Sequence, residues 1–133
     1  MATPRLILRI ELDSGRLGHG KIELLEQIRD GQSLAAAARA MNMSYKRAWD
    51  LLAALNEMFD EPVAVSHPGR TVAGATTLTA FGERLIALYR ALERRAEQAT
   101  VAGREELAAA SRRAVRARRS QPAEKAPKAT RPR

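Results

Sequence analysis

Alternating hydrophobic and charged residues open the chain. Apolar side chains at every second position over 6–12 predict a strand, which ends at Ser14-Gly15. The letters that follow, RLGHGK, predict a loop. Apolar residues then recur at helical spacing over 21–29, so we expect a first helix that Asp30-Gly31 terminates.

Two short helices joined by a tight turn come next. Ser33 is the expected N-cap of a helix over 34–41, and Asn42 is a residue type that tolerates the left-handed conformation just past a helix end. Ser44 is the expected cap of a third helix, which runs to about Phe59. This arrangement is typical of a helix-turn-helix.

A hairpin and a long helix complete the pattern. Short strands are predicted over 63–66 and 76–78, on either side of the turn-rich tip HPGRTVAGA. From Thr79 a long helix follows, with a narrow apolar seam typical of a helix that pairs with another helix. The seam consists of Phe81, Leu85, Leu88, Leu92, Ala96 and Ala99. The order of elements predicts a mainly α fold with a small β component, a winged helix-turn-helix with a long C-terminal dimerisation helix.

Charge is distributed unevenly along the 133 residues. The formal net charge is +8, and residues 104–133 hold ten basic against three acidic side chains, a net of +7. We therefore expect two parts. Residues 1–102 form the winged helix-turn-helix domain with its linker helix, and residues 103–133 form a basic Ala/Arg/Pro-rich tail that is partly helical and then disordered. Because the first part is close to neutral, the high isoelectric point is no evidence that it binds nucleic acid.

Several classes of protein find no support in the composition. The chain has no cysteine, so disulfides and thiolate metal ligands are excluded and a reducing cytoplasm is expected. No stretch reaches the roughly 18 apolar residues of a membrane span, so no membrane partner is expected. His19 and His67 lack metal-ligand spacing, and GRLGHGK lacks the spacing of a phosphate-binding loop. We therefore expect no enzyme, no metal site and no cofactor.

Helical geometry sorts the third helix by face, since successive residues lie about 100° apart. One arc is apolar and is expected to face the core. It consists of Ala48, Leu51, Leu52, Leu55, Met58 and Phe59. Lys46 and Asp50 lie on roughly the opposite side. Because they are one helical turn apart, we expect an ion pair between them. Tyr45, Trp49 and Asn56 share one flank.

The first turn of this helix projects polar and charged side chains beside free backbone N–H groups and the positive end of the helix dipole. Ser44, Tyr45, Lys46 and Arg47 in this turn suit a phosphate or a base edge. The alternative interpretation is an ordinary amphipathic helix with a solvated Lys-Arg pair. The helix-turn-helix joint before this helix and the hairpin after it favour a contact with nucleic acid.

Two segments resemble a known family. The run SLAAAARAMNMSYKRAWDLLAALN is similar to the helix-turn-helix of the ModE family, whose N-terminal DNA-binding domain is related to that of LysR-type regulators. The run TLTAFGERLIALY resembles the segment leading into the linker helix of both families. The match covers about residues 5–99. The wing departs from the family pattern, since Arg70, Thr71 and Val72 replace some of the glycines usual there.

The resemblance implies roles for the start of the third helix. Ser44, Tyr45, Lys46 and Arg47 align with the start of the recognition helix, and Trp49 aligns with a tryptophan that helps to lock the motif together. A tryptophan on the flank of a helix most often packs, so the residues alone also predict a structural role for Trp49.

Two further residues are candidate DNA contacts. Ser33 is primarily a cap, although its hydroxyl could also reach a phosphate. Arg70 at the tip of the wing could contact a phosphate or the minor groove. Full-length ModE proteins carry C-terminal molybdate-binding domains, to which nothing here corresponds. We therefore expect a stand-alone form that does not bind molybdate.

The first hypothesis is a bacterial transcription regulator that binds double-stranded DNA in the cytoplasm, in association with the nucleoid. Its recognition helix enters the major groove, and its long helix forms a homodimer through Leu85, Leu88, Leu92 and Ala96. The two recognition helices would then lie about one DNA turn, roughly 34 Å, apart.

Two other functions stay open. A non-specific architectural DNA binder would use the basic tail and show a steep salt dependence. A protein-interaction module would reuse the winged-helix fold, in line with the near-neutral charge of the folded part. The binding properties of the folded part by itself separate these hypotheses from the first.

Overall fold

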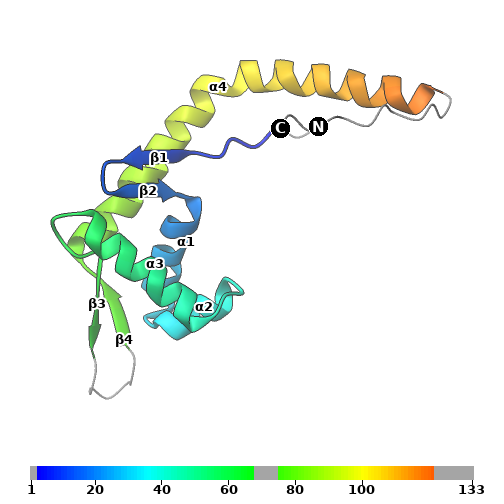
Figure 1. The fold of residues 1–133 in the computed structure, drawn as a ribbon. Coiled ribbons are helices and arrows are strands. Elements are labelled where there is room, and N and C mark those ends of the chain that lie inside the picture. The colour runs from blue at the N-terminus through cyan, green and yellow to red at the C-terminus, as the bar shows by residue number, and fades with distance from the viewer. Residues whose placement is uncertain (1–2, 68–74, 122–133) are drawn as a thin grey trace, which may run out of the picture. The chain divides into compact units, whose positions relative to one another are not determined.

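The computed structural model describes residues 3–67 and 75–121. Its elements, in chain order, are β1 (Arg9–Leu12), β2 (Gly15–Gly18), α1 (His19–Gly31), α2 (Leu34–Ala40), α3 (Tyr45–Met58), β3 (Ala64–His67), β4 (Ala75–Leu78) and α4 (Ala80–Ser120) (Figure 1). The fold is mainly helical, with two small antiparallel hairpins and a long C-terminal helix. This architecture is consistent with the predicted winged helix-turn-helix.

The chain divides into two compact units. The larger unit, Leu6–Gln98, contains both hairpins, α1 to α3 and the first part of α4. The smaller unit consists of residues 1–5 and 99–133. Within the smaller unit, the Thr3 hydroxyl donates a hydrogen bond to Glu105 at 3.3 Å, and the Arg104 guanidinium donates one to the Pro4 carbonyl. Helix α4 continues to Ser120.

The N-terminal hairpin corrects the predicted loop. Residues of the RLGHGK stretch form the strand β2 and the start of α1, and β2 pairs antiparallel with β1, with Ile10 opposite Leu17. Gly15 makes the reversal possible with a φ of +153°, a conformation that favours glycine. Leu17 is buried in the core. Pairing with β1, a contact across the turn, makes this polar, glycine-containing segment a strand.

The caps of α1 and α2 are of the predicted types, although the left-handed residue after α1 lies one position later than predicted. Helix α1 ends at Gly31, but the left-handed C-cap is the next residue, Gln32 (φ +52°), whose N–H donates to Ile28 O at 2.7 Å. The Ser33 hydroxyl caps α2 by accepting a bond from the Ala36 N–H at 3.1 Å. Asn42 adopts a φ of +55° after α2, which confirms its predicted role.

Aliphatic side chains from every part of the larger unit form the core, which positions α3. The largest fully buried hydrophobic residues are Ile22, Leu24, Leu25, Ile28, Leu55, Val63 and Tyr89. Helix α4 approaches the start of β3 closely at Gly82, where a Cβ atom would lie 2.1 Å from Val63 O. Thr79 holds this junction, since its hydroxyl donates to Pro62 O at 2.7 Å and accepts from the Gly82 N–H at 3.0 Å.

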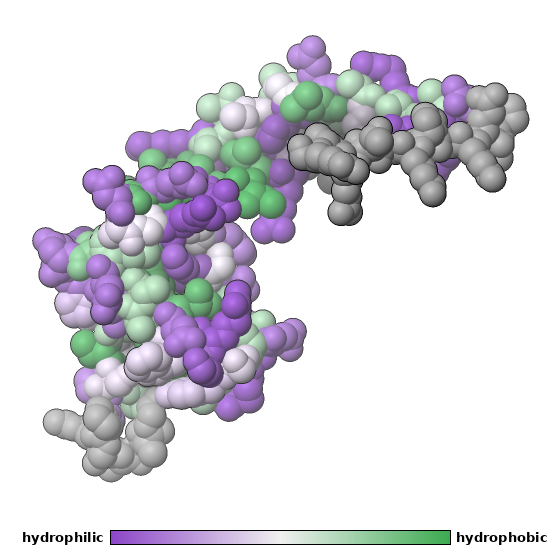
Figure 2. All heavy atoms as spheres, in the orientation of Figure 1, coloured by the Kyte–Doolittle hydropathy of each residue, from purple (hydrophilic) through white to green (hydrophobic). Residues whose placement is uncertain are grey.

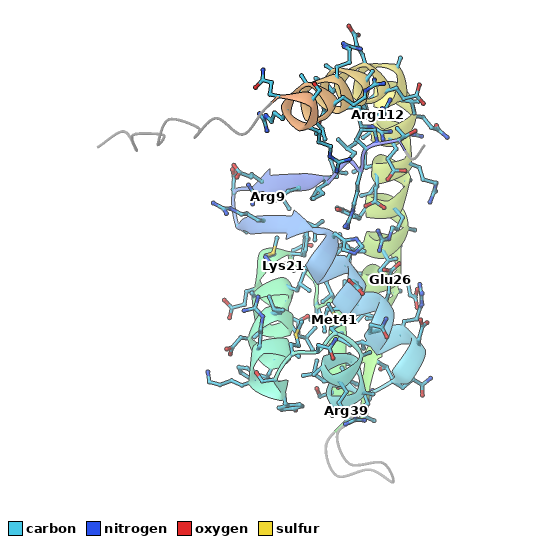
Figure 3. All side chains as sticks on the ribbon, turned by 90° about the vertical axis from the view of Figure 1, so that its right-hand side faces the viewer. Arg9, Lys21, Glu26, Arg39, Met41 and Arg112 are labelled. Atoms are coloured by element: carbon cyan, nitrogen blue, oxygen red, sulfur yellow. The ribbon has the colours of Figure 1, made fainter. Side chains whose placement is uncertain are left out.

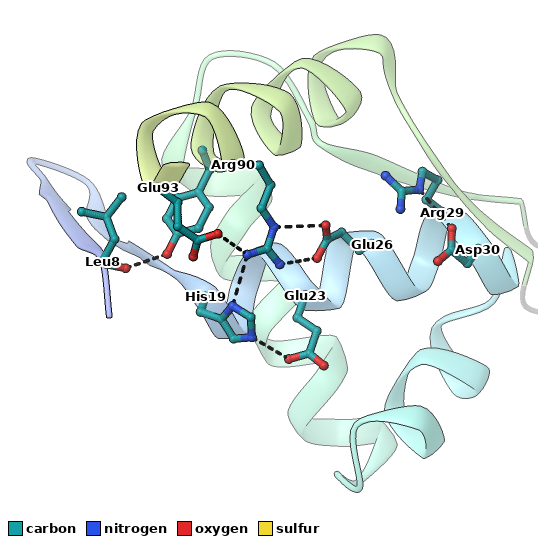
Figure 4. A network of polar contacts seen from close by, with 9 residues as sticks. Leu8, His19, Glu23, Glu26, Arg29, Asp30, Arg90 and Glu93 are labelled. Carbon is teal, nitrogen blue, oxygen red and sulfur yellow. Dashed lines mark hydrogen bonds and ion pairs between the residues drawn. The ribbon is translucent and has the colours of Figure 1, made fainter. Parts of the chain in front are cut away.

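A half-buried polar network joins α1 to α4 (Figure 4). The Arg90 guanidinium donates to both carboxylate oxygens of Glu26, at 2.6 and 3.2 Å, and to Glu93 at 2.8 Å. Its hydrogen bonds to Glu26 raise the pKa of Arg90, so the charge is permanent. The neighbouring Tyr89 phenol donates to Leu8 O at 2.6 Å, and burial raises the pKa of Tyr89. Near the N-terminal end of α1, Lys21, labelled in Figure 3, donates to Arg16 O in β2.

Candidate nucleic-acid interface

The N-terminal turn of α3 is exposed and carries the predicted contact residues. The helix begins at Tyr45, and the Ser44 hydroxyl accepts a bond from the Arg47 N–H at 3.1 Å, which confirms Ser44 as the cap. Tyr45 is 56% exposed, and Lys46 and Arg47 are also exposed. One phenol, two cations and the positive end of the helix dipole therefore lie together on the surface.

The opposite face of α3 anchors this turn in the core. Ala48, Leu52, Leu55 and Met58 are buried, and Leu51 and Phe59 pack against them, so the predicted core arc is confirmed. The predicted pair between Lys46 Nζ and Asp50 is also present, at 3.4 Å. Because both groups are exposed, this pair is weak and leaves Lys46 available to another anion.

Helix α2 brings a second hydroxyl and the wing together. Ser33 forms a β-bridge with Ala75 at the start of β4, and the Thr76 N–H donates to Gln32 O at 3.1 Å. The Ser33 hydroxyl accepts its capping bond and keeps its own O–H to donate to another acceptor. Arg39, at the C-terminal end of α2, is exposed (Figure 3). Arg70, the predicted contact at the wing tip, lies outside the described residues.

Asn56 links α3 to the wing, a role that the sequence analysis missed. Its Oδ1 accepts bonds from the N–H groups of Val63, at 2.8 Å, and Ala64, at 3.4 Å. Its Nδ2 donates to Ala64 O at 3.5 Å. The signal in the sequence is the position of Asn56 on the same flank of α3 as Tyr45 and Trp49. That flank faces β3.

A groove of about 150 Å³ runs between α3 and β3. It is lined by Trp49, Leu52, Ala53, Asn56, Ala64 and Ser66. The sequence predicts a structural role for Trp49, whereas the structure leaves 55% of this residue exposed. Trp49 therefore forms one wall of the groove and presents much of its ring to the surroundings.

This chain has relatives among curated proteins, although no family model matches it. The molybdenum transport protein ModE of Azotobacter vinelandii is 38% identical over 96 residues, which cover 70% of this chain and 36% of that protein. The molybdenum-pterin-binding protein MopB of Rhodobacter capsulatus is 40% identical over 84 residues, 63% of this chain and 31% of MopB. The DNA-binding transcriptional dual regulator ModE of Escherichia coli is 33% identical over 69 residues, 52% of this chain and 26% of that regulator.

The chain is homologous to the N-terminal region of ModE transcriptional regulators. The resemblance predicted from the sequence is therefore confirmed. It spans about a third of the length of the first curated relatives it matches. The expectation that it is not an enzyme agrees with these relatives, because the ModE homologues are transcriptional regulators.

The four residues predicted to pair two copies of this chain lie in different environments on α4. Leu85 is 6% exposed and packs in the core of its own chain. Leu88 and Leu92 are 60% and 38% exposed, and Ala96 is partly buried. Figure 2 shows hydrophobic residues interrupting the hydrophilic surface on the face it presents. Of these four residues, Leu85 is therefore covered by its own chain, and Leu88 and Leu92 are the exposed ones.

Within residues 3–67 and 75–121, no helix combines the length and the apolar character that crossing a membrane requires. Within the same ranges, no three side chains of the His, Cys, Asp or Glu type are grouped so that they could hold a metal ion.

Proposed function

We propose that this chain is a transcription regulator that binds double-stranded DNA, with the N-terminal turn of α3 in the major groove. The observation that carries the proposal is the Ser44-capped turn, which exposes Tyr45, Lys46 and Arg47 at the positive end of the helix dipole. The homology to ModE regulators supports the same function. The sites of action would be the chromosome and thus the bacterial cytoplasm.

The contacts in this proposal divide by chemistry. Arg47 can donate two parallel bonds to a guanine edge, whereas Lys46 acts as a point charge toward phosphate. The Ser33 and Ser44 hydroxyls can donate to phosphates while they keep their capping bonds. Arg70 stays a proposed contact from the wing.

We further propose a homodimer that forms through α4. Leu88 and Leu92 are exposed one helical turn apart, and Ala96 continues their row. Packing this row against a second copy would remove apolar surface from water. A dimer would present two copies of the α3 turn to a two-fold symmetric site, with half-sites about one DNA turn apart.

Non-specific DNA binding by the basic region is the second candidate function. Helix α4 carries Arg112, Arg113, Arg116, Arg118 and Arg119 in its last turns. Cations so dense on a helix suit the phosphate backbone, whatever the base sequence. The two functions are compatible, because such a region would raise general affinity and leave the choice of site to α3.

Selection of the full chain on random duplex DNA tests the proposal. We expect enrichment of a two-fold symmetric site. Replacing Arg47 by Ala should weaken binding to that site by ~1–3 kcal/mol if the side chain reads a base. Arg94→Ala removes an equal charge from an exposed position of α4 and serves as the matched control.

Each outcome of the selection has a distinct meaning. Equal losses for Arg47→Ala on selected and unrelated duplexes would assign Arg47 to phosphate alone. No enriched site, together with a salt dependence that the arginines of 112–119 dominate, would leave only the architectural function. No DNA binding even at low salt would favour a protein-interaction module.

For these residues we expect no effect of molybdate on DNA affinity. The relative MopB is named for binding molybdenum-pterin, but the match covers 31% of its length. Repeating the DNA titration with and without molybdate tests the expectation. A change in affinity on addition of molybdate would contradict it.

A further inference from the structure

Trp49 is the single tryptophan of the chain. Tyr45 precedes it by one helical turn, so the two aromatic rings lie on the same flank of α3. Both are more than half exposed. Large aromatic side chains are normally buried at least in part against other groups, and two adjacent exposed rings are typical of a binding surface.

The groove beside Trp49 offers apolar and polar surface in similar amounts. Leu52, Ala53 and Ala64 contribute aliphatic groups to its lining. The amide of Asn56 is engaged, since both its oxygen and its nitrogen bond the backbone at the start of β3. An occupant of this groove would therefore meet aliphatic groups and an aromatic ring next to polar groups of the same lining, among them the Ser66 hydroxyl.

The position of the groove indicates which molecule would cover it. Trp49, which lines the groove, follows the N-terminal turn of α3 by about one helical turn, and the exposed Lys46 and Arg47 in that turn favour a polyanion. The other wall of the groove is β3, a strand of the wing. An occupant bound by the α3 turn and the wing together would lie directly over Trp49. On the proposed function, that occupant is the DNA duplex.

We propose that Trp49 makes the apolar part of this DNA contact and that its partner is the 5-methyl group of a thymine. The methyl group of thymine is the one apolar group on the base edges of the major groove. This inference rests on the proposed function and adds a specificity determinant to it. It replaces the purely structural role that the sequence predicts for Trp49.

The test is a thermodynamic cycle on the selected duplex. Each thymine of the site is replaced in turn by deoxyuridine, which lacks only the methyl group, and affinity is measured for the full-length wild type and for Trp49→Ala. At one thymine the replacement should weaken wild-type binding roughly threefold to fivefold and leave Trp49→Ala unchanged. Leu107→Ala, which removes exposed apolar surface elsewhere, should show the wild-type response at every thymine.

Fluorescence supplies a second readout that needs no substitution. Because Trp49 is the only tryptophan, its emission reports this site alone. Saturation with the selected duplex should lower quenching by the neutral quencher acrylamide at least twofold. Anisotropy of a labelled duplex measures DNA binding in the same samples. Absence of binding would remove the proposed function, whereas binding without a change in quenching would remove only this inference.

Three results would overturn the inference. One is unchanged quenching at full saturation with DNA. Another is a loss of DNA affinity that is equal in wild type and Trp49→Ala at every deoxyuridine replacement. If circular dichroism shows that Trp49→Ala does not fold, Trp49→Phe takes its place in this comparison. The last is protection from acrylamide that rises with protein concentration in the absence of DNA, because a second copy would then be the occupant.

Discussion

Asn56 on α3 accepts a 2.8 Å hydrogen bond from the backbone N–H of Val63, the residue before β3. Val63 is fully buried, so this N–H is shielded from water. The bond joins the proposed recognition helix to the wing through one side chain. The spacing of the two proposed DNA-binding elements therefore depends on Asn56.

Replacing Asn56 by Ala should lower the free energy of unfolding by ~1–3 kcal/mol, because the buried Val63 N–H loses its acceptor. Urea unfolding followed by circular dichroism measures the loss. Glu57→Ala changes the exposed neighbour and should stay within ~0.5 kcal/mol of wild type. Equal effects of the two substitutions would show that the Asn56 bond contributes nothing to stability.

Local signals in the sequence predict the helix-turn-helix well. Ser33 and Ser44 are caps, Asn42 takes the left-handed conformation, and the core arc of α3 is buried. Each of these features depends on neighbours within about one turn, which the sequence displays directly. The strand β2 was missed because its four residues, GRLG, have no strand pattern of their own and depend on pairing with β1.

The candidate site is only partly predictable for the same reason. Helical geometry places Trp49 and Asn56 on one flank, but only the position of β3 shows that this flank lines a groove and bonds the wing. A heptad-like seam likewise cannot separate Leu85, which packs inside the chain, from Leu88, which is exposed. The spacing of apolar residues does not show which of them are covered by segments that are distant in the sequence.

Gly82 should tolerate no side chain. A Cβ atom there would lie 2.1 Å from Val63 O, so Gly82→Ala requires α4 to move away from the start of β3. We expect a loss of at least ~2 kcal/mol in urea unfolding. Gly103→Ala is the matched control, since it lies in the same helix and a Cβ meets nothing within 4 Å. Alanine at 103 should stabilise the helix by ~0.5–1 kcal/mol. Equal stability of the two variants would contradict the close approach.

Tyr89 should make the protein less stable in alkali. Burial raises the pKa of its phenol above the ordinary value near 10. The contribution of the protonated phenol is therefore fully present below about pH 10 and is lost as pH rises through the folded-state pKa, because the unfolded chain releases its proton first. Urea midpoints measured from pH 8 to 11 should fall more steeply for wild type than for Tyr89→Phe.

The same variant separates ionisation from hydrogen bonding. At neutral pH, Tyr89→Phe loses the 2.6 Å bond to Leu8 O and should be less stable by ~1 kcal/mol. Above pH 10 that difference should shrink, because phenylalanine cannot ionise. A constant difference across the range would mean that Tyr89 does not titrate during unfolding.

The exposed row on α4 should control association. The double variant Leu88→Glu/Leu92→Glu places two negative charges on the apolar surface that is proposed to face a second copy. We expect the mass measured by light scattering to fall from that of a dimer to that of a monomer. Affinity for the two-fold symmetric DNA site should fall with it, because each monomer then binds one half-site alone.

A charge elsewhere on the same helix distinguishes interface disruption from a general effect of acidity. Ala87→Glu introduces a carboxylate at an exposed position beside Leu88 but about 100° away around the helix, so it should leave the dimer mass unchanged. Leu85→Glu should instead unfold the domain, because Leu85 lies in the core of its own chain. A wild-type chain that is monomeric at every concentration would remove the dimer and require each half-site to bind independently.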